Sequence, residues 1–135
     1  MLEHVAHRVM THELATSRTP DELALASVGV YAKLLVHLSS ILGEAGSHAL
    51  FRSSLRLTPF PFLNEIRAQE PTALLKALNT ALQKHKPDVA VKVSIALLTA
   101  FIELLATFVG ERLTCELLHD VWPTVNTDQS QEMPK

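Results

Sequence analysis

The sequence predicts an all-α fold, a single-domain bundle of five or six helices with two long apolar core helices. Three observations support this. The apolar residues recur with the helical period, in segments that are too long for strands. One of these segments, residues 88–122, is apolar on nearly every side, as the central helix of a core would be. The chain has 135 residues, which is the size of one domain.

The composition limits the classes of function. Charged residues make up only 19% of the chain, below the usual quarter, which is compatible with a face that is buried against another subunit. Twelve Lys and Arg against fourteen Asp and Glu give a formal net charge of −2. Such a chain has no overall positive field to collect phosphates, so we expect no nucleic-acid partner.

The N-terminus and the cysteine content indicate a compartment. The first residues lack a basic region followed by an apolar run, so they do not resemble a secretory signal. Cys115 is the only cysteine in the sequence, which rules out an internal disulfide. We therefore expect a cytoplasmic protein.

Two helices are predicted before the first glycine. Residues 2–16 carry apolar side chains near helical spacing and predict a short amphipathic helix that ends near Ser17. The run Thr19-Pro20-Asp21-Glu22 then supplies a capping hydroxyl, a proline for the first turn and two acids that complement the helix dipole. A second helix should therefore run from about Pro20 to Leu42.

Small or polar residues form one narrow stripe along this second helix, and most other positions are apolar. Gly43 and Gly46 then predict a bend or a stop. A third helix should follow, with Arg52 and Arg56 on its outer side. The small or polar stripe of the second helix consists of Glu22, Ala26, Gly29, Lys33, His37 and Ser40.

An aromatic corner is predicted in the middle of the chain. Prolines on either side of Phe60 prevent a continuous helix through Phe62, because each proline lacks a backbone donor and holds the preceding residue in an extended conformation. The corner, with Arg52 and Arg56, is a candidate contact for a protein partner. Arginines that alternate with core leucines are also the ordinary pattern of an amphipathic helix. A short helical turn at 63–68 and a fourth helix opened by proline should follow.

The central helix begins at Pro87-Asp88 in the same way as the second helix begins. Lys92, Thr99 and Glu103 fall on one side of it, which predicts a narrow edge that faces water or another subunit. Gly110 either bends this helix or separates it from a sixth one. The number of helices therefore stays at five or six.

Two segments of the sequence resemble each other weakly. The segments ILGEAGSHALF and FVGERLTCELL share an apolar pair, a Gly-Glu dipeptide and a second apolar pair, and they lie sixty-seven positions apart. Each follows a long apolar helix and begins a shorter amphipathic one. A duplication predicts a bundle with pseudo-twofold symmetry, and a chance match between two helical segments is the alternative.

The closing helical segment carries a resemblance. Gly110-Glu111, Leu113-Thr114 and Trp122-Pro123 resemble the ending of small, uncharacterised all-helical bacterial proteins. The resemblance covers about a tenth of the chain and implies a bacterial helical domain, with no functional residue. We expect the domain to span residues 1–123 and the polar remainder, 124–135, to be a disordered tail.

Metal and catalytic signatures are weak. His4, His7 and His12 spread over about 140° of the first helix, too wide for three ligands of one ion. Glu116 and His119 have the Glu-x-x-His spacing of di-iron bundles, but such a site needs two motifs of this kind. The sequence has no glycine-rich phosphate loop and no nucleophile elbow. We expect no metal and no cofactor, and the sequence favours a protein that is not an enzyme.

These observations lead to two main hypotheses. The first is a non-enzymatic interaction or regulatory module that acts as a homodimer, with an apolar helical face or the Phe60 and Phe62 corner as its contact. The alternative is a small-molecule sensor whose core holds an apolar or haem-like ligand against Tyr31, His37 or His119. A di-iron-type helical-bundle enzyme is the third. Charges inside both long helices would be costly in lipid, so we expect no membrane partner.

Overall fold

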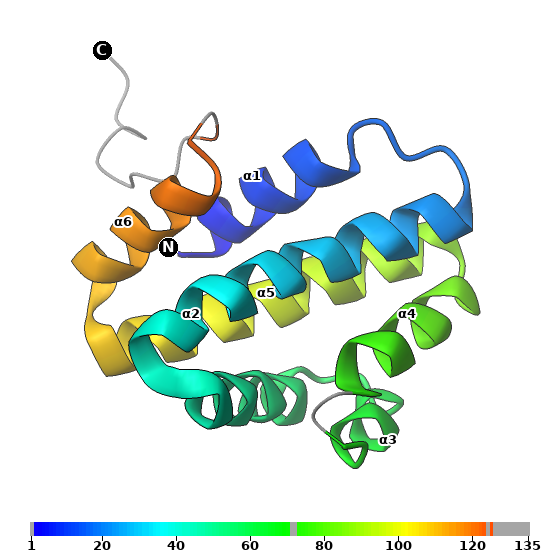
Figure 1. Ribbon diagram of the computed structural model, residues 1–135. Coiled ribbons are helices and arrows are strands. Elements are labelled where there is room, and N and C mark those ends of the chain that lie inside the picture. Colours follow the sequence, from blue (N-terminus) through cyan, green and yellow to red (C-terminus); the bar gives the residue numbers. More distant parts are fainter. Residues whose placement is uncertain (1, 71–72, 124, 126–135) are drawn as a thin grey trace.

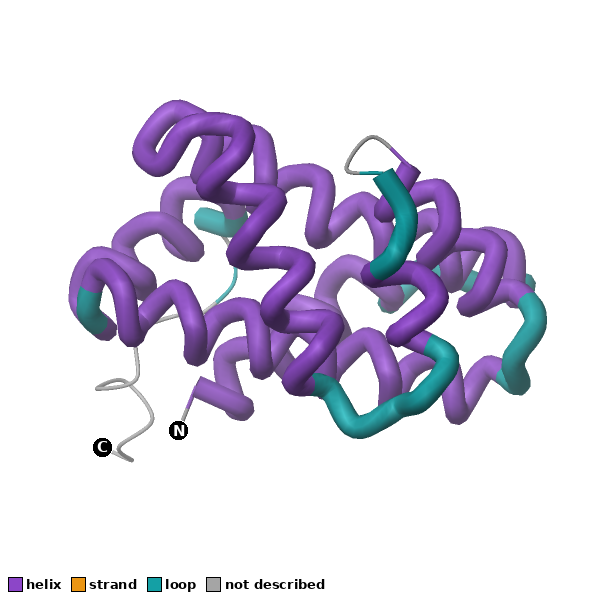
Figure 2. The backbone as a smooth tube through the Cα atoms, turned by 90° about the horizontal axis from the view of Figure 1, so that it is seen from below, coloured by secondary structure: helices purple, strands orange, loops and turns teal. Residues whose placement is uncertain are grey.

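The structure is a computed structural model that describes residues 2–70, 73–123 and 125. The described residues form six α-helices and no strand, which confirms the all-α bundle with two long apolar helices (Figure 1). Short connections join the helices (Figure 2). The helices are α1 (Leu2–Leu14), α2 (Pro20–Leu57), α3 (Leu63–Arg67), α4 (Leu74–Gln83), α5 (Pro87–Val109) and α6 (Glu111–Val121).

Two long helical segments form the middle of the bundle. One is the part of α2 before its glycine, residues 20–42, which we call the α2 rod, and the other is α5. Both have proline in the first turn, and in the α2 rod the Thr19 hydroxyl accepts a hydrogen bond from the backbone N–H of Glu22 at 3.1 Å. The two rods pack against each other and run in the same direction (Figure 1).

A glycine with positive φ ends each rod. Gly43 has φ 81° and ψ 163°, and Gly110 has φ 91° and ψ 158°, a region that is almost restricted to glycine. The hydroxyl four residues later donates back to the glycine carbonyl in both places, from Ser47 at 2.8 Å and from Thr114 at 2.7 Å. The predicted interruption at Gly43 is confirmed, and Gly110 separates α5 from a sixth helix.

The chain follows the same path twice. We call residues 44–57 the α2 return segment. In the order of the chain, α1, the α2 rod and the α2 return segment correspond to α4, α5 and α6. In Figure 1, α1 and α6 lie above the rods, and α4 and the α2 return segment lie below them. A half-turn about an axis along the rods therefore exchanges the two halves, which is the pseudo-twofold arrangement that the sequence repeat predicts.

The core lies between the rods and the helices that cover them. Leu34 of the α2 rod and Phe101 of α5, which are equivalent in the two halves, are both fully buried. The rings of Tyr31, Phe51 and Phe101 form a chain with centres 5.5 and 5.6 Å apart. Tyr31 donates its hydroxyl to the carbonyl of Ser94 at 2.6 Å. Burial raises the pKa of Tyr31 well above its usual value.

The limits of the helical region differ slightly from those expected. The first helix ends at Leu14, a few residues before Ser17. At the other end Trp122 and Val125 are buried, with 3% and 7% of their surface exposed, so the core extends two residues beyond the expected limit. The rest of the expected tail, residues 124 and 126–135, lies outside the described residues.

Candidate interaction surface

Both rods leave much of their length uncovered by the rest of the chain. By length and composition alone, α2 and α5 could each cross a bilayer, a test that the core helix of a soluble protein also passes. In the most apolar stretch of 18 residues, only 33% of the residues are buried in α2 and only 44% in α5. Each rod therefore presents an outer face.

The outer face of the α2 rod is apolar. Leu25 and Val36 point away from the core, with 65% and 71% of their surface exposed. They lie eleven positions apart, or about three helical turns. Gly29 and Ala32 lie between them on the same side and are half-buried. These four residues, which we call the α2 outer face, include no charged and no hydrogen-bonding side chain.

An ion pair borders the α2 outer face. Lys33, next to Ala32, lies 2.7 Å from the Glu13 carboxylate of α1, and the Glu13 side chain is only 17% exposed. The Lys33 ammonium also lies 5.9 Å from the centre of the Trp122 ring. Half of the Lys33 side chain stays exposed, so this ammonium forms a polar border along one side of the apolar strip.

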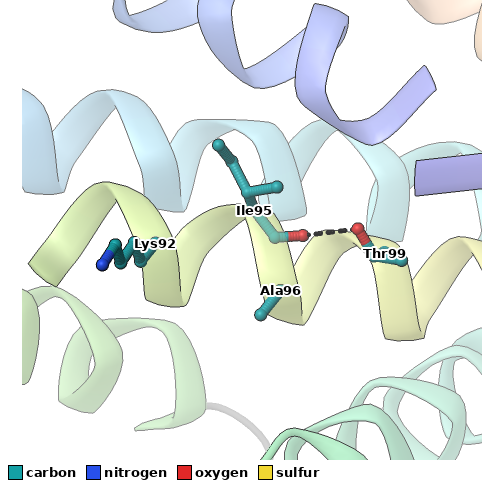
Figure 3. Close-up of a pocket in the computed structure, with 4 residues that line it drawn as sticks. All are labelled: Lys92, Ile95, Ala96 and Thr99. Carbon is teal, nitrogen blue, oxygen red and sulfur yellow. Dashed lines mark hydrogen bonds between the residues drawn. The ribbon is translucent and has the colours of Figure 1, made fainter. Parts of the chain in front are cut away.

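The equivalent face of α5 is polar. Lys92 and Glu103 are exposed, which confirms the polar edge predicted for this helix. Figure 3 shows Lys92, Ile95, Ala96 and Thr99 around a shallow hollow of about 440 Å³, with the Thr99 hydroxyl donating to the Ile95 carbonyl at 2.7 Å. The equivalent pairs, sixty-seven positions apart, are Leu25 and Lys92, Gly29 and Ala96, Ala32 and Thr99, and Val36 and Glu103.

Gly29 has no packing reason within the described chain. It lies in the middle of the α2 rod without a positive φ, and a Cβ added there would meet no atom within 4 Å. A glycine in the interior of a helix destabilises it by about 0.5–1 kcal/mol relative to alanine. A close approach by something outside the chain would explain the glycine.

A second apolar surface adjoins the two glycine breaks. A groove of about 310 Å³ lies between the α2 rod, the end of α5 and α6. Ile41 and Leu113 line it with 61% and 56% of their surface exposed, and His37 and Glu116 supply polar groups. This volume is at the lower end of the range for small-molecule sites.

The aromatic corner folds back onto the chain. Phe60 and Phe62 are half-buried and pack against the core, and the Phe62 ring lies 4.4 Å from that of His85. Arg52 donates to a backbone carbonyl of the α3–α4 connection at 3.1 Å, so it braces this region. Of the four residues predicted to bind a partner here, Arg56 alone is exposed.

The three residues predicted to hold a ligand do not meet. Tyr31 is fully buried among aromatic rings. His37 is exposed and lines the groove, whereas His119 is exposed on α6 and is not part of that lining. His37 is therefore the only one of the three that borders this groove.

The residues considered for a metal site or for catalysis face solvent. The three histidines of α1 are exposed, and so are Glu116 and His119, whereas a di-iron site requires side chains that point into the bundle. Within the part of the chain that the structure describes, no group of three His, Cys, Asp or Glu could hold an ion. Cys115 is half-buried on α6.

Sequence reasoning missed the α2 outer face. The stripe predicted for this helix follows its polar residues, including Lys33, and leaves out Leu25 and Val36, which are exposed. Burial depends on how α1 and α4 cover the rod, which the sequence of the rod does not reveal. The repeat held a usable signal, because it aligns Leu25 and Val36 with the predicted polar edge of α5.

Comparisons with protein-family models, with curated proteins and with solved structures found no match. The resemblance of the closing segment to small bacterial helical proteins therefore stays a prediction. The α2 outer face, with its polar counterpart on α5, is the feature from which a function can be argued.

Proposed function

We propose that this protein is a non-enzymatic interaction module that acts as a homodimer, with the α2 outer face as its contact. The observation that carries the proposal is the exposure of Leu25 and Val36 at positions where the other half has Lys92 and Glu103. The fold therefore does not require apolar residues at these positions. Exposed apolar surface of this kind is typical of contact sites.

The expected affinity follows from the size of this contact. Burying one large aliphatic side chain contributes about 1.5–3 kcal/mol, and two copies would bury four such side chains. Association itself costs about 4–15 kcal/mol in lost freedom of motion. Contacts between the flanking helices α1 and α4 of the two copies must therefore add to the free energy of association. We expect a dissociation constant of about 1 µM or weaker.

Native mass spectrometry and sedimentation velocity over about 1–100 µM test this proposal. We expect a shift from monomer to dimer as the concentration rises. In the double variant Leu25→Lys/Val36→Glu, which introduces the residues of α5, the dimer should be lost while the helical circular dichroism is unchanged.

The matched control is Leu57→Lys, because Leu57 is 55% exposed but lies in the α2 return segment. This variant should dimerise like the wild type. A wild-type chain that stays monomeric over the whole range, or a double variant that dimerises normally, would contradict the proposal.

The alternative is a small-molecule sensor that uses the groove beside His37. The observation that favours it is the apolar lining of this groove together with one imidazole at its edge. An absorbance titration with haem tests it, with His37→Ala as the variant and His119→Ala as the matched control. Haem binding that only His37→Ala removes would support the sensor, and the absence of any spectral change would count against haem as the ligand.

A further inference from the structure

We propose that the second copy docks in an antiparallel orientation, with Leu25 of one chain opposite Val36 of the other and Gly29 opposite Ala32. The twofold axis would pass between the two rods and perpendicular to them, level with the midpoint of positions 30 and 31. This inference rests on the proposed function, because it specifies the partner and the geometry of the same face.

The order of residues on the α2 outer face is self-complementary. The midpoint between Leu25 and Val36 is also the midpoint between Gly29 and Ala32. A twofold axis between the two rods, perpendicular to them and level with this point, therefore places each large side chain opposite a large one and each small residue opposite a small one. A homodimer with twofold symmetry needs this property, since both copies contribute the same patch.

The polar groups at the two ends of the rod favour the same orientation. Asp21 and Glu22 lie in its first turn, and His37 and Ser40 lie near its other end, all exposed. An antiparallel pair brings the acids of one copy to the imidazole and hydroxyl of the other. A parallel pair would instead bring acids against acids, which is unfavourable, and would align the two helix dipoles in the same direction.

The small residues at the centre set how closely the rods approach. Gly29 and Ala32 lie next to the proposed axis, where two crossing helices come nearest to each other. Because no atom of the described chain lies within 4 Å of a Cβ built on Gly29, the space beside it is open to a partner helix. Leu25 and Val36 would then pack on either side of this close contact.

Disulfide trapping tests the orientation. Leu25→Cys and Val36→Cys are made separately in a Cys115→Ser chain, and each is oxidised alone and in an equimolar mixture. The antiparallel pair predicts a covalent 25–36 dimer in the mixture, at least about tenfold more than in either variant alone. Copies of the same position would lie about 16 Å apart along the rods, beyond the reach of a disulfide.

The outcomes separate the two proposals. A dimer by sedimentation that cross-links 25 to 25 and 36 to 36 would overturn the antiparallel orientation and leave the homodimer standing. A chain that stays monomeric would overturn both proposals, as would a monomer that floats with phosphatidylcholine vesicles, because the α2 outer face would then be a lipid contact.

Gly29→Leu provides an independent measurement. A leucine at the proposed crossing point should raise the dissociation constant of the dimer at least about tenfold, which corresponds to about 1.4 kcal/mol. The matched control is Ala96→Leu at the equivalent position of α5, which should leave the constant unchanged. Equal effects of the two variants, or no effect of Gly29→Leu, would overturn the placement of Gly29 at the contact.

Discussion

The two halves of the chain are alike in what holds the fold together and unlike on the outer faces of their rods. Both rods start with Pro-Asp, end at a glycine with positive φ and bury large side chains at equivalent positions. They differ on the outer face, where Leu25 and Val36 on one rod correspond to Lys92 and Glu103 on the other. Features shared by the halves are those that the fold needs, and the outer faces are free to serve a function.

The largest effect is expected in the shared core. Leu34→Ala and Phe101→Ala occupy equivalent, fully buried positions, and they should lower the free energy of unfolding by about 2–5 and 3–5 kcal/mol. Urea denaturation of both variants gives these values. A loss below about 1 kcal/mol in either variant would show that the halves do not share the core equally.

The glycine breaks should produce the next largest effect. Gly43→Ala and Gly110→Ala force an alanine into a region of φ and ψ that glycine alone adopts readily, so each should lower the free energy of unfolding by about 1–3 kcal/mol. A Cβ at either position meets no atom within 4 Å, so the cost is one of backbone conformation. Thermal and urea unfolding measure this cost. If Gly110→Ala left the free energy of unfolding unchanged, the ends of the two rods would not be equivalent.

A smaller effect distinguishes the halves inside the core, because Tyr31 corresponds to Leu98. Burial raises the pKa of Tyr31 in the folded chain, so the stability it contributes is complete below the unfolded pKa of about 10 and is lost as the pH rises through the folded pKa. Tyr31→Phe should lower the free energy of unfolding at neutral pH by about 1 kcal/mol, since the hydrogen bond to Ser94 is lost.

The pH dependence of unfolding checks the same residue. The free energy of unfolding of the wild type should fall above about pH 10, and this fall should be smaller in Tyr31→Phe. Denaturant titrations at several alkaline pH values measure both curves. Identical curves for the two proteins would show that Tyr31 does not cause the loss of stability at alkaline pH.

Replacing residues of the outer face of α5 by those of the α2 outer face should have the smallest effect on stability. We expect the same change to have a large effect on assembly. Lys92→Leu/Glu103→Val replaces both charges of the α5 face by the side chains of the α2 outer face, and at exposed positions it should change the free energy of unfolding by less than about 0.5 kcal/mol. With two apolar faces on opposite sides of the bundle, the chain should form assemblies larger than a dimer in sedimentation velocity. A variant that assembles like the wild type would mean that apolar side chains alone do not make the contact.

Local signals made much of this fold predictable. Pro20 and Pro87 predict helix starts and Gly43 predicts an interruption, because each acts on the backbone of its own neighbourhood. The sequence left open whether Gly110 bends or ends its helix, and Gly46, predicted with Gly43 to bend or stop the helix, lies inside one. The exposure of Leu25 was not predictable in this way, since it depends on the distance between α1 and α4 on the surface of the rod. The burial of Val125 likewise depends on contacts with distant segments.

The aromatic corner illustrates the same limit. The prolines correctly predict a break in the helix around Phe60, but they carry no information on whether its ring turns inward. The half-buried rings and the bracing hydrogen bond of Arg52 result from the packing of α3 and α4 against α2. A residue type and its spacing thus identify a turn more reliably than they identify a binding surface.

The first helix of each half packs mainly on the rod of the other half, and this arrangement affects folding. The contacts of α1 are more extensive with α5 than with α2, its neighbour in the chain, and α4 packs extensively on α2. During synthesis α1 must therefore wait until α5 has emerged before its main partner is present. Although the chain repeats one path twice, neither half can complete its core alone, so we expect the whole domain to unfold in one cooperative transition.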